Sequence, residues 1–529
     1  MSLEPGTVTP LLDRSRVSAA RLSSLAERVP AGGSDSIVVR APATDDPLGT
    51  VPVCTAQEVE TAVDRARNAQ TAWEQTPVSD RAAVLDRFGD LVLDHRDPLL
   101  DLLQLETGKS RRHGVEETIE VPINCTYYAD RGPAVLADEE RDAGVAVGST
   151  ARVTYDPVGV VGVISPWNYP VSLAMSEVVP ALMAGNSVVL KPDEKTPFAA
   201  LALAELLERA GLPDGVLTVV TGDPEVVGTG LIDGVDHVAF TGSTETGRLV
   251  AERAGRNLVE CSLELGGNNP LLVLDDADVA TAARGAAQGA FANAGQLCLA
   301  PERIYVDESV YEAFLDALVG ATRRLSLGTG FDYSDDVGSL IDADQLARVE
   351  SHVEDAVADG ASVLTGGRHR PDVGPFCYEP TILTDVDPDS TVACEETFGP
   401  VVSVTPVPDT AAAVEAANDS PYGLNASVWT GDRDRGERVA REIDCGTVCV
   451  NDAYQVGWVA VDAPMGGFGD SGLGRRHGPE GIRRFLESRT IATSRIGPLD
   501  GAPGVPNVLT VRGLVAVAHL QRAIQRWLR

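Results

Sequence analysis

Lysine is nearly absent from this chain of 529 residues, although acidic residues are abundant. Only Lys109, Lys191 and Lys195 occur, Asp and Glu together number 78, and the formal net charge is −35. Because such a surface repels polyanions, we expect no nucleic-acid partner. An acidic surface that is poor in lysine is also typical of proteins that work in concentrated salt, where the screening length falls to about 3 Å at 1 M.

Long apolar segments are missing as well. No run approaches the roughly 18 apolar residues that a membrane helix needs, and no N-terminal segment resembles a signal peptide. We therefore expect no integral membrane segment and a cytoplasmic location. Hydrophobic residues make up 43% of the chain, and its length is sufficient for two or three domains with well-filled cores.

The eight cysteines form neither a CxxC pair nor a regular disulfide framework. Cys445 and Cys449 are four residues apart, but no group of histidines or further cysteines completes a set of metal ligands around them. The cysteine pattern therefore predicts no metal site.

One cysteine has unusual surroundings. Cys298 ends the run Asn293-Ala294-Gly295-Gln296-Leu297-Cys298, whose small residues can expose its sulfur. Glu264 precedes the turn Gly266-Gly267, which can bring a carboxylate close to it. A cysteine nucleophile needs a nearby proton acceptor, because the thiolate is the reactive form. The ordinary alternative is a buried core cysteine and a glutamate at a turn.

Predicted strands and helices alternate in two blocks, which indicates two doubly wound α/β domains. The first block has strands at 158–164, 187–190, 216–220 and 237–240, and helices at 197–210, 223–231 and 244–254. The second block runs from about 275 to 465, with strands at 303–306, 401–406 and 446–451, and a short apolar strand at 271–274 lies just before it.

Seven short runs occur in an order that resembles the aldehyde dehydrogenase superfamily, from about residue 35 to about residue 495. They are ISPWNYP (164–170), KP (191–192), FTGS (240–243), LELGGNNP (263–270), GQLC (295–298), EETFGP (395–400) and PMGG (464–467). The longer run APMGGFGDSGLGRRHGPEG (463–481) is most similar to the branch of succinate-semialdehyde dehydrogenases.

This resemblance implies a division of the chain. Residues 1–135 and 158–274 would form the dinucleotide-binding domain, and residues 275–470 the catalytic domain. Segments 136–157 and 485–499 would form a small oligomerisation sheet, so we expect a homodimer or homotetramer. Residues 500–529 remain as a tail, in which Leu514, Val517, Leu520, Ile524 and Trp527 recur at helical spacing.

The resemblance also implies a covalent mechanism. Cys298 would attack an aldehyde, the Asn168 amide and the Cys298 backbone N–H would hold the oxyanion, and Glu264 would activate water to hydrolyse the thioester. The alternative for Asn168 is a turn residue between two prolines. Asn268, where many relatives have lysine, looks like a change at the surface.

The expected cofactor is NAD, with NADP possible. Ser243 suits the N-cap of a helix whose first N–H groups would bind phosphate. The run 242–247 does not match a nucleoside-triphosphate-binding loop, because its second glycine is not followed by Lys and then Ser or Thr. Lys191 would hold the adenosine ribose, and the Glu194 carboxylate would repel a 2′-phosphate; the alternative is a surface ion pair between them. The further residues expected to contact the cofactor are Ile164, Trp167, Gly222, Phe240, Gly242, Gly247, Leu265, Glu396 and Phe398.

A literal GxGxxG at 467–472 follows no strand, and we interpret it, together with Arg475 and Arg476, as a surface turn.

Two functional alternatives concern the substrate. The nearest branch suggests succinate semialdehyde, yet Ser176 and Ala292 stand where such enzymes carry carboxylate-binding arginines. The side chains expected to line the pocket predict apolar or aromatic aldehydes; they are Tyr127, Tyr169, Leu173, Tyr454 and Trp458. A CoA-acylating enzyme would share Cys298 but usually lacks a base such as Glu264, and a non-catalytic protein of this fold would be free to lose both.

Overall fold

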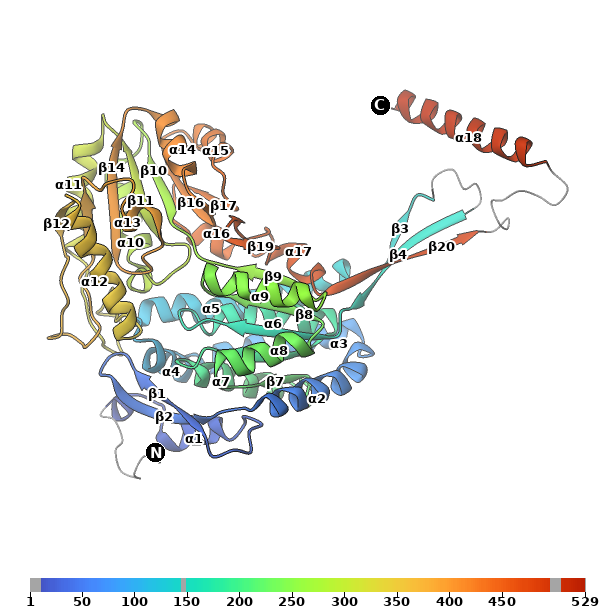
Figure 1. The fold of residues 1–529 in the computed structure, drawn as a ribbon, viewed down its shortest axis with the longest axis horizontal. Helices are drawn as coiled ribbons and strands as arrows, with labels where there is room; N and C mark the ends of the chain where they lie inside the picture. The colour runs from blue at the N-terminus through green and yellow to red at the C-terminus, as the bar shows by residue number, and fades with distance from the viewer. Residues whose placement is uncertain (1–10, 144–148, 495–505, 529) are drawn as a thin grey trace.

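Two predominantly parallel sheets form the centres of two α/β units, and a third, smaller sheet protrudes from the first unit (Figure 1). The computed structural model describes residues 11–143, 149–494 and 506–528. The predicted pair of doubly wound α/β units is confirmed. No helix in the described part of the chain is long and apolar enough to cross a membrane.

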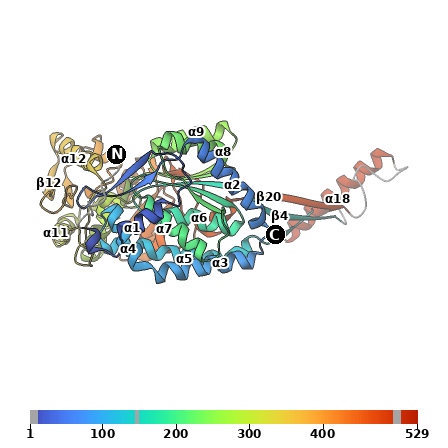
Figure 2. The ribbon, with the colours of Figure 1, turned by 90° about the horizontal axis from the view of Figure 1, so that it is seen from below.

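The first unit contains a six-stranded sheet in the order β19-β9-β8-β5-β6-β7. Its strands are β5 (Val160–Ser165), β6 (Ser187–Pro192), β7 (Leu217–Val219), β8 (His237–Thr241), β9 (Glu260–Glu264) and β19 (Gly472–Leu473). The valine-rich β5 and β6 are almost wholly buried, as expected where helices cover both faces of a parallel sheet. Figure 2 shows α8 and α9 along one side of this unit and α3 and α5 along the other.

The helices of the first unit come from three stretches of the chain. They are α1 (Ala19–Ala26), α2 (Ala56–Glu74), α3 (Val78–Asp94), α4 (Arg96–Thr107), α5 (Arg111–Val135), α6 (Ser172–Ala184), α7 (Pro197–Arg209), α8 (Thr229–Gly234), α9 (Thr244–Arg256) and α17 (Gly478–Arg483). Short turns η1 (Leu12–Arg14) and η2 (Pro224–Gly228) and a hairpin of β1 (Ser36–Ala41) with β2 (Asp46–Pro52) complete the unit.

The second unit contains a seven-stranded sheet in the order β12-β13-β14-β11-β10-β16-β17. Its strands are β10 (Asn269–Val273), β11 (Pro301–Asp307), β12 (Ser362–Thr365), β13 (Thr381–Thr384), β14 (Val401–Val407), β16 (Asn425–Trp429) and β17 (Thr447–Val450). Its helices are α10 (Val279–Ala290), η3 (Ala292–Gly295), α11 (Tyr311–Thr322), α12 (Ala343–Ala358), α13 (Thr391–Cys394), α14 (Thr410–Asn418), α15 (Arg433–Ala440) and α16 (Gln455–Val459). A separate pair joins β15 (Tyr422–Gly423) to β18 (Phe468–Gly469).

The chain passes between the two sheets earlier than the sequence indicated. β10 pairs with β11 and β16 of the second sheet, so the crossover falls between Glu264 and Asn269 rather than at residue 274. The chain later returns, because β19 pairs with β9 of the first sheet. Both crossovers lie beside Glu264.

The protruding sheet joins β3 (Glu139–Arg141), β4 (Ser149–Pro157) and β20 (Leu486–Ser494). Beyond it lies α18 (Asn507–Leu528), which confirms the helix expected in the tail and stands apart from both α/β units in both views (Figures 1 and 2). The ends of the predicted segments 485–499 and 500–529 fall partly outside the described residues.

Candidate active site

The loop before Cys298 has an unusual backbone. Asn293 and Ala294 have φ angles of 50° and 56°, and Gly295 follows at 72°. The left-handed region is costly for residues with a Cβ, and such residues cluster at functional sites where the surroundings enforce them. A Cβ on Gly295 would lie 1.9 Å from the Gly399 carbonyl oxygen, so the turn requires glycine. The strained turn presents Cys298 at the interface of the two units.

Cys298 lines a cavity of about 250 Å³ together with Glu264 and Asn168. Burial, together with the nearby Glu396 carboxylate, raises the pKa of the Cys298 thiol to about 12, and the Arg476 guanidinium opposes the rise. The resting sulfur is therefore protonated at neutral pH, and a group that accepts its proton must act when it reacts.

Glu264 is the last residue of β9 and lies opposite Gly472 of β19. Burial raises the pKa of its carboxyl group to about 7, and Arg476 is the main group that opposes the rise. A base that titrates near the working pH is the kind that proton transfer favours. The Leu265 N–H donates to the Ser471 carbonyl at 3.0 Å, so the crossing chain fixes the position of this strand end.

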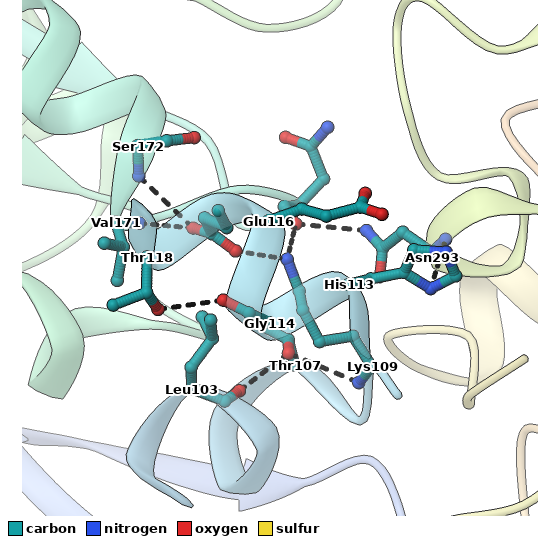
Figure 3. Close-up of polar contacts among 12 residues, drawn as sticks. Leu103, Thr107, Lys109, His113, Gly114, Glu116, Thr118, Val171, Ser172 and Asn293 are labelled. Atoms are coloured by element: carbon teal, nitrogen blue, oxygen red, sulfur yellow. Dashed lines mark hydrogen bonds and ion pairs between the residues drawn. The ribbon is translucent and has the colours of Figure 1, made fainter. Parts of the chain in front are cut away.

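Asn168 is held by a buried ion pair, of whose surroundings Figure 3 labels Lys109, Val171 and Ser172. Lys109 pairs with Glu117 on α5 and donates from Nζ to the Asn168 carbonyl at 2.8 Å. The Glu117 carboxylate also accepts from the Val171 N–H at 2.6 Å, at the start of α6. The Asn168 side-chain amide donates to the Gln296 carbonyl at 3.1 Å, and an amide has a second N–H to offer. The only lysine with a fully buried side chain thus supports the loop that carries the predicted oxyanion donor.

A larger cavity of about 780 Å³ lies beside the first sheet. Predicted cofactor residues line it, namely Ile164, Trp167, Lys191, Glu194, Phe240, Gly242 and Ser243. Ser243 caps α9, because its side chain accepts from the Thr246 N–H at 3.2 Å, and the predicted N-cap is confirmed. The Lys191 ammonium lies 3.0 Å from the Glu194 carboxylate, so the two residues do form an ion pair. Both residues also line the larger cavity.

The chemistry of these residues fits a dinucleotide. The N–H groups at the start of α9 suit a pyrophosphate, and Lys191 and Glu194 suit a ribose. A Cβ on Gly242 would lie 2.6 Å from the Phe240 ring, so this side of the cavity stays open only with glycine.

Three of the remaining predicted cofactor residues lie nearer Cys298. Leu265, Glu396 and Phe398 line the smaller cavity, whereas Gly222 and Gly247 line neither. Phe398 has a φ of 55° and meets the Trp167 ring edge-to-face, with the ring centroids 5.5 Å apart. Its N–H donates at 2.9 Å to the buried carboxylate of Glu302, which holds this strained residue in place.

Four of the five predicted pocket residues lie in one apolar cluster against Cys298: Tyr169, Leu173, Tyr454 and Trp458. Ala292 belongs to the same cluster, and buried Ser176 donates to the Leu173 carbonyl at 3.3 Å. Tyr127 is not part of it, because it packs at the edge of the first unit's core and donates to Asp462 at 2.8 Å.

Two residues interpreted as surface residues are buried instead. Asn268 is 1% exposed, and its amide donates to the Ala393 and Glu395 carbonyls. These two hydrogen bonds join the turn that follows Glu264 to the loop that carries Glu396. Arg476 is 2% exposed and lies 3.8 Å from Glu264. Neither position has a local sequence signal, because both are buried by distant segments.

Comparison with known proteins agrees with this geometry. The profile of the aldehyde dehydrogenase family matches residues 29–491. The chain belongs to this family. It is an oxidoreductase that oxidises an aldehyde with NAD(P) as cofactor.

Individual relatives are similar over most of their length. A protein of Mycobacterium ulcerans (strain Agy99) named "Putative succinate-semialdehyde dehydrogenase (NADP(+)) 2" is 50% identical over 476 residues, 90% of this chain and 92% of that protein. The succinate-semialdehyde dehydrogenase (NADP(+)) of Escherichia coli (strain K12) is 39% identical over 463 residues, 87% of this chain and 95% of the enzyme.

Solved structures share the fold as well. The crystal structure described as an E. coli NADP-dependent enzyme has a TM-score of 0.85 at 38% identity, and the match covers 88% of this chain and 96% of that one. The NAD+ complex of an aldehyde dehydrogenase from Bacillus cereus has a TM-score of 0.84 at 34% identity, and the match covers 88% of this chain and 95% of that one.

Proposed function

We propose that the aldehyde is oxidised through a thioester on Cys298 and that Glu264 drives its hydrolysis. The observation that carries the proposal is the meeting of Cys298, Glu264 and Asn168 on one cavity at the junction of the two units. A thiol, a carboxylate with a pKa near 7 and an amide donor are the groups that covalent aldehyde oxidation requires.

In this mechanism Glu264 accepts the thiol proton and the Cys298 sulfur forms a bond to the aldehyde carbon. The Asn168 amide and the Cys298 backbone N–H donate to the resulting oxyanion. NAD(P), which the residues of the larger cavity would hold, would supply the hydride acceptor, and loss of hydride from that carbon would leave an acyl group on Cys298. Glu264 then releases the thiol proton to solvent and takes a proton from water, and hydroxide adds to the acyl carbon. The C–S bond breaks to release the acid, and the proton on Glu264 returns to the Cys298 sulfur.

Glu264 also separates this proposal from CoA acylation. An acylating enzyme passes the acyl group to a thiol and has no use for a base that activates water. In this chain the Glu264 carboxylate is kept beside Cys298 by the pairing of β9 with β19, which supports hydrolysis.

The Glu194 carboxylate supports a preference for NAD. Three further carboxylates line the larger cavity with it, those of Asp193, Glu225 and Glu252. The cavity also contains two arginines, but Arg253 already pairs with Asp233 and Arg256 with Glu252. A 2′-phosphate would meet mainly negative charge there.

We expect kcat/KM to be higher with NAD than with NADP, and Glu194→Ser to move the ratio toward NADP by about tenfold or more, because one repelling charge is removed. Steady-state kinetics with both cofactors measure the ratio. Glu194→Gln is the matched control for side-chain size and must move the ratio in the same direction. A wild type that clearly favours NADP would contradict the role assigned to Glu194.

The substrate we propose is an apolar or aromatic aldehyde. Ser176 and Ala292 offer no positive charge to a distal carboxylate, and Tyr454 of the apolar cluster donates at 3.1 Å to the Glu116 carboxylate. Arg112 nearby lies 3.8 Å from Asp336. Succinate semialdehyde remains the second candidate, on the strength of the names of the relatives.

We expect kcat/KM for benzaldehyde or hexanal to exceed that for succinate semialdehyde by about tenfold or more, because the carboxylate would be desolvated without a partner. Spectrophotometric rates of NADH formation compare the three aldehydes, and butanal serves as the control of equal chain length without the charge. A clear advantage for the semialdehyde would show that another cation binds the carboxylate.

Composition and the protruding sheet support a homo-oligomer that works in the cytoplasm at high salt. β20 is exposed along most of its nine residues, and a long exposed edge strand is a template for pairing with another copy. On α18 the predicted stripe is exposed at Leu514, Leu520, Ile524 and Trp527, so a second subunit would have an apolar face to cover.

We therefore expect deletion of residues 505–529 to lower both the oligomeric mass and the melting temperature. Light scattering measures the mass and calorimetry the melting temperature at matched salt. The variant Leu520→Asp/Ile524→Asp, which keeps the tail but charges its apolar face, should act in the same direction. Unchanged assembly and stability in both variants would rule out this role of α18.

A further inference from the structure

A buried arginine lies directly beside the Glu264 carboxylate. The Arg476 side chain is 2% exposed, and its Nε lies 3.8 Å from Glu264 Oε1. Within the described residues this buried Nε has no hydrogen-bond partner. A buried donor without a partner is costly, so the nearby carboxylate, directly or through one water, is the group that can satisfy it.

Arg476 is anchored independently of Glu264. Its Nη2 donates to the Thr241 hydroxyl at 3.0 Å and lies 3.2 Å from the Glu177 carboxylate of α6. Its backbone exchanges two hydrogen bonds with Met465, at 2.8 Å and 2.7 Å. The guanidinium is thus fixed before Glu264 moves or changes charge, and Thr241 lines both cavities.

The charged groups around the Arg476 guanidinium do not pair one to one. Glu177 also pairs with Arg484, so two guanidinium groups share one carboxylate. Guanidinium groups stay protonated in proteins, so Glu177 alone does not neutralise this pair, and Glu264 faces the charge of Arg476.

Other titratable groups face the same region. Glu120 on α5 lies 3.5 Å from His477, next to Arg476 in the chain. Arg475 donates to the Gly467 and Gly474 carbonyls, at 3.2 Å and 2.6 Å. Its charge and that of Arg484 also lower the pKa of the Glu264 carboxyl group, but less than Arg476 does. The Glu264 carboxylate is left as the group opposite Arg476 Nε.

We propose that Arg476 is the positioning residue for thioester hydrolysis: it keeps the Glu264 carboxylate ionised and in place to take a proton from water. The inference rests on the proposed role of Glu264 as the base. Because burial raises the pKa of Glu264 to about 7 even beside Arg476, loss of the guanidinium would leave this group protonated at neutral pH. Arginine does not release protons at these pH values, so its role is electrostatic rather than that of a relay.

The test is the pH dependence of the rate after the first turnover, measured on the full-length enzyme. We expect an inflection near pH 7 in the wild type. In Arg476→Met it should move to higher pH by about one unit or more, and the rate at pH 7 should fall about fivefold or more. Arg476→Lys, which keeps the charge, should restore much of the wild-type profile. Arg438→Gln, an exposed arginine 3.9 Å from Asp432, is the control.

A second variant should shift the inflection in the opposite direction. The Glu177 carboxylate raises the pKa of Glu264, so Glu177→Gln should move the inflection to lower pH. An Arg476→Met enzyme that loses rate equally at all pH values would overturn the proposal. If Arg476→Met does not fold, an unmoved inflection in Glu177→Gln would overturn it as well. An inflection that persists in Glu264→Gln would instead refute the role of Glu264 itself.

Discussion

Replacing Cys298 with alanine should abolish aldehyde oxidation, with a loss of about 10⁴-fold or more in kcat, because no other group can form the thioester. The fold should survive, since Cys298 lines a cavity and the smaller alanine fits its space. Initial rates of NAD(P)H formation measure the loss, and circular dichroism checks the fold.

Cys394→Ala is the matched control for this substitution. Cys394 is an exposed cysteine on α13 and lines neither cavity, so we expect wild-type rates from this variant. Dehydrogenase activity close to that of the wild type in Cys298→Ala would refute the assignment of the nucleophile.

Replacing Glu264 with glutamine should separate the two halves of the reaction. Oxidation should still give a rapid burst of NAD(P)H of up to one equivalent per site when the pH is high enough to ionise part of the thiol. The steady-state rate should fall by about 10²–10⁴-fold, because glutamine cannot accept a proton from water. Stopped-flow absorbance resolves both phases.

The control lies on the same strand. Glu260, at the exposed start of β9, keeps the same residue type but is remote from the cavity, so Glu260→Gln should leave both phases unchanged. Equal loss of burst and steady state in Glu264→Gln, at a pH high enough to ionise part of the thiol, would contradict a separate role of Glu264 in hydrolysis.

Local sequence patterns predicted much of this fold. The valine-rich runs of β5 and β6 and the start of α9 at Ser243 are visible in the sequence, because strand propensity and helix capping depend on near neighbours. The ordered motifs also placed Cys298, Glu264 and Asn168 in one site, although they lie in three separate segments.

Burial by distant segments was not predictable in this way. Arg476 looked like part of a surface turn, yet the pairing of β19 with β9 carries it to the Glu264 side chain. Lys109 and Glu117 are close in sequence, but their contacts with Asn168 and Val171 depend on how α5 packs beside α6. A charged residue inside a core is recognisable only when its partners are known.

The most direct test of the covalent account is the intact mass of Glu264→Gln after it is mixed with an aldehyde and the oxidised cofactor. We expect a mass increase equal to one acyl group per chain, located by peptide mapping on Cys298, and absent when the cofactor is omitted and the sample is denatured in acid. If NAD(P)H forms while the protein mass stays unchanged throughout the reaction, oxidation proceeds without a thioester on Cys298 and the account is wrong.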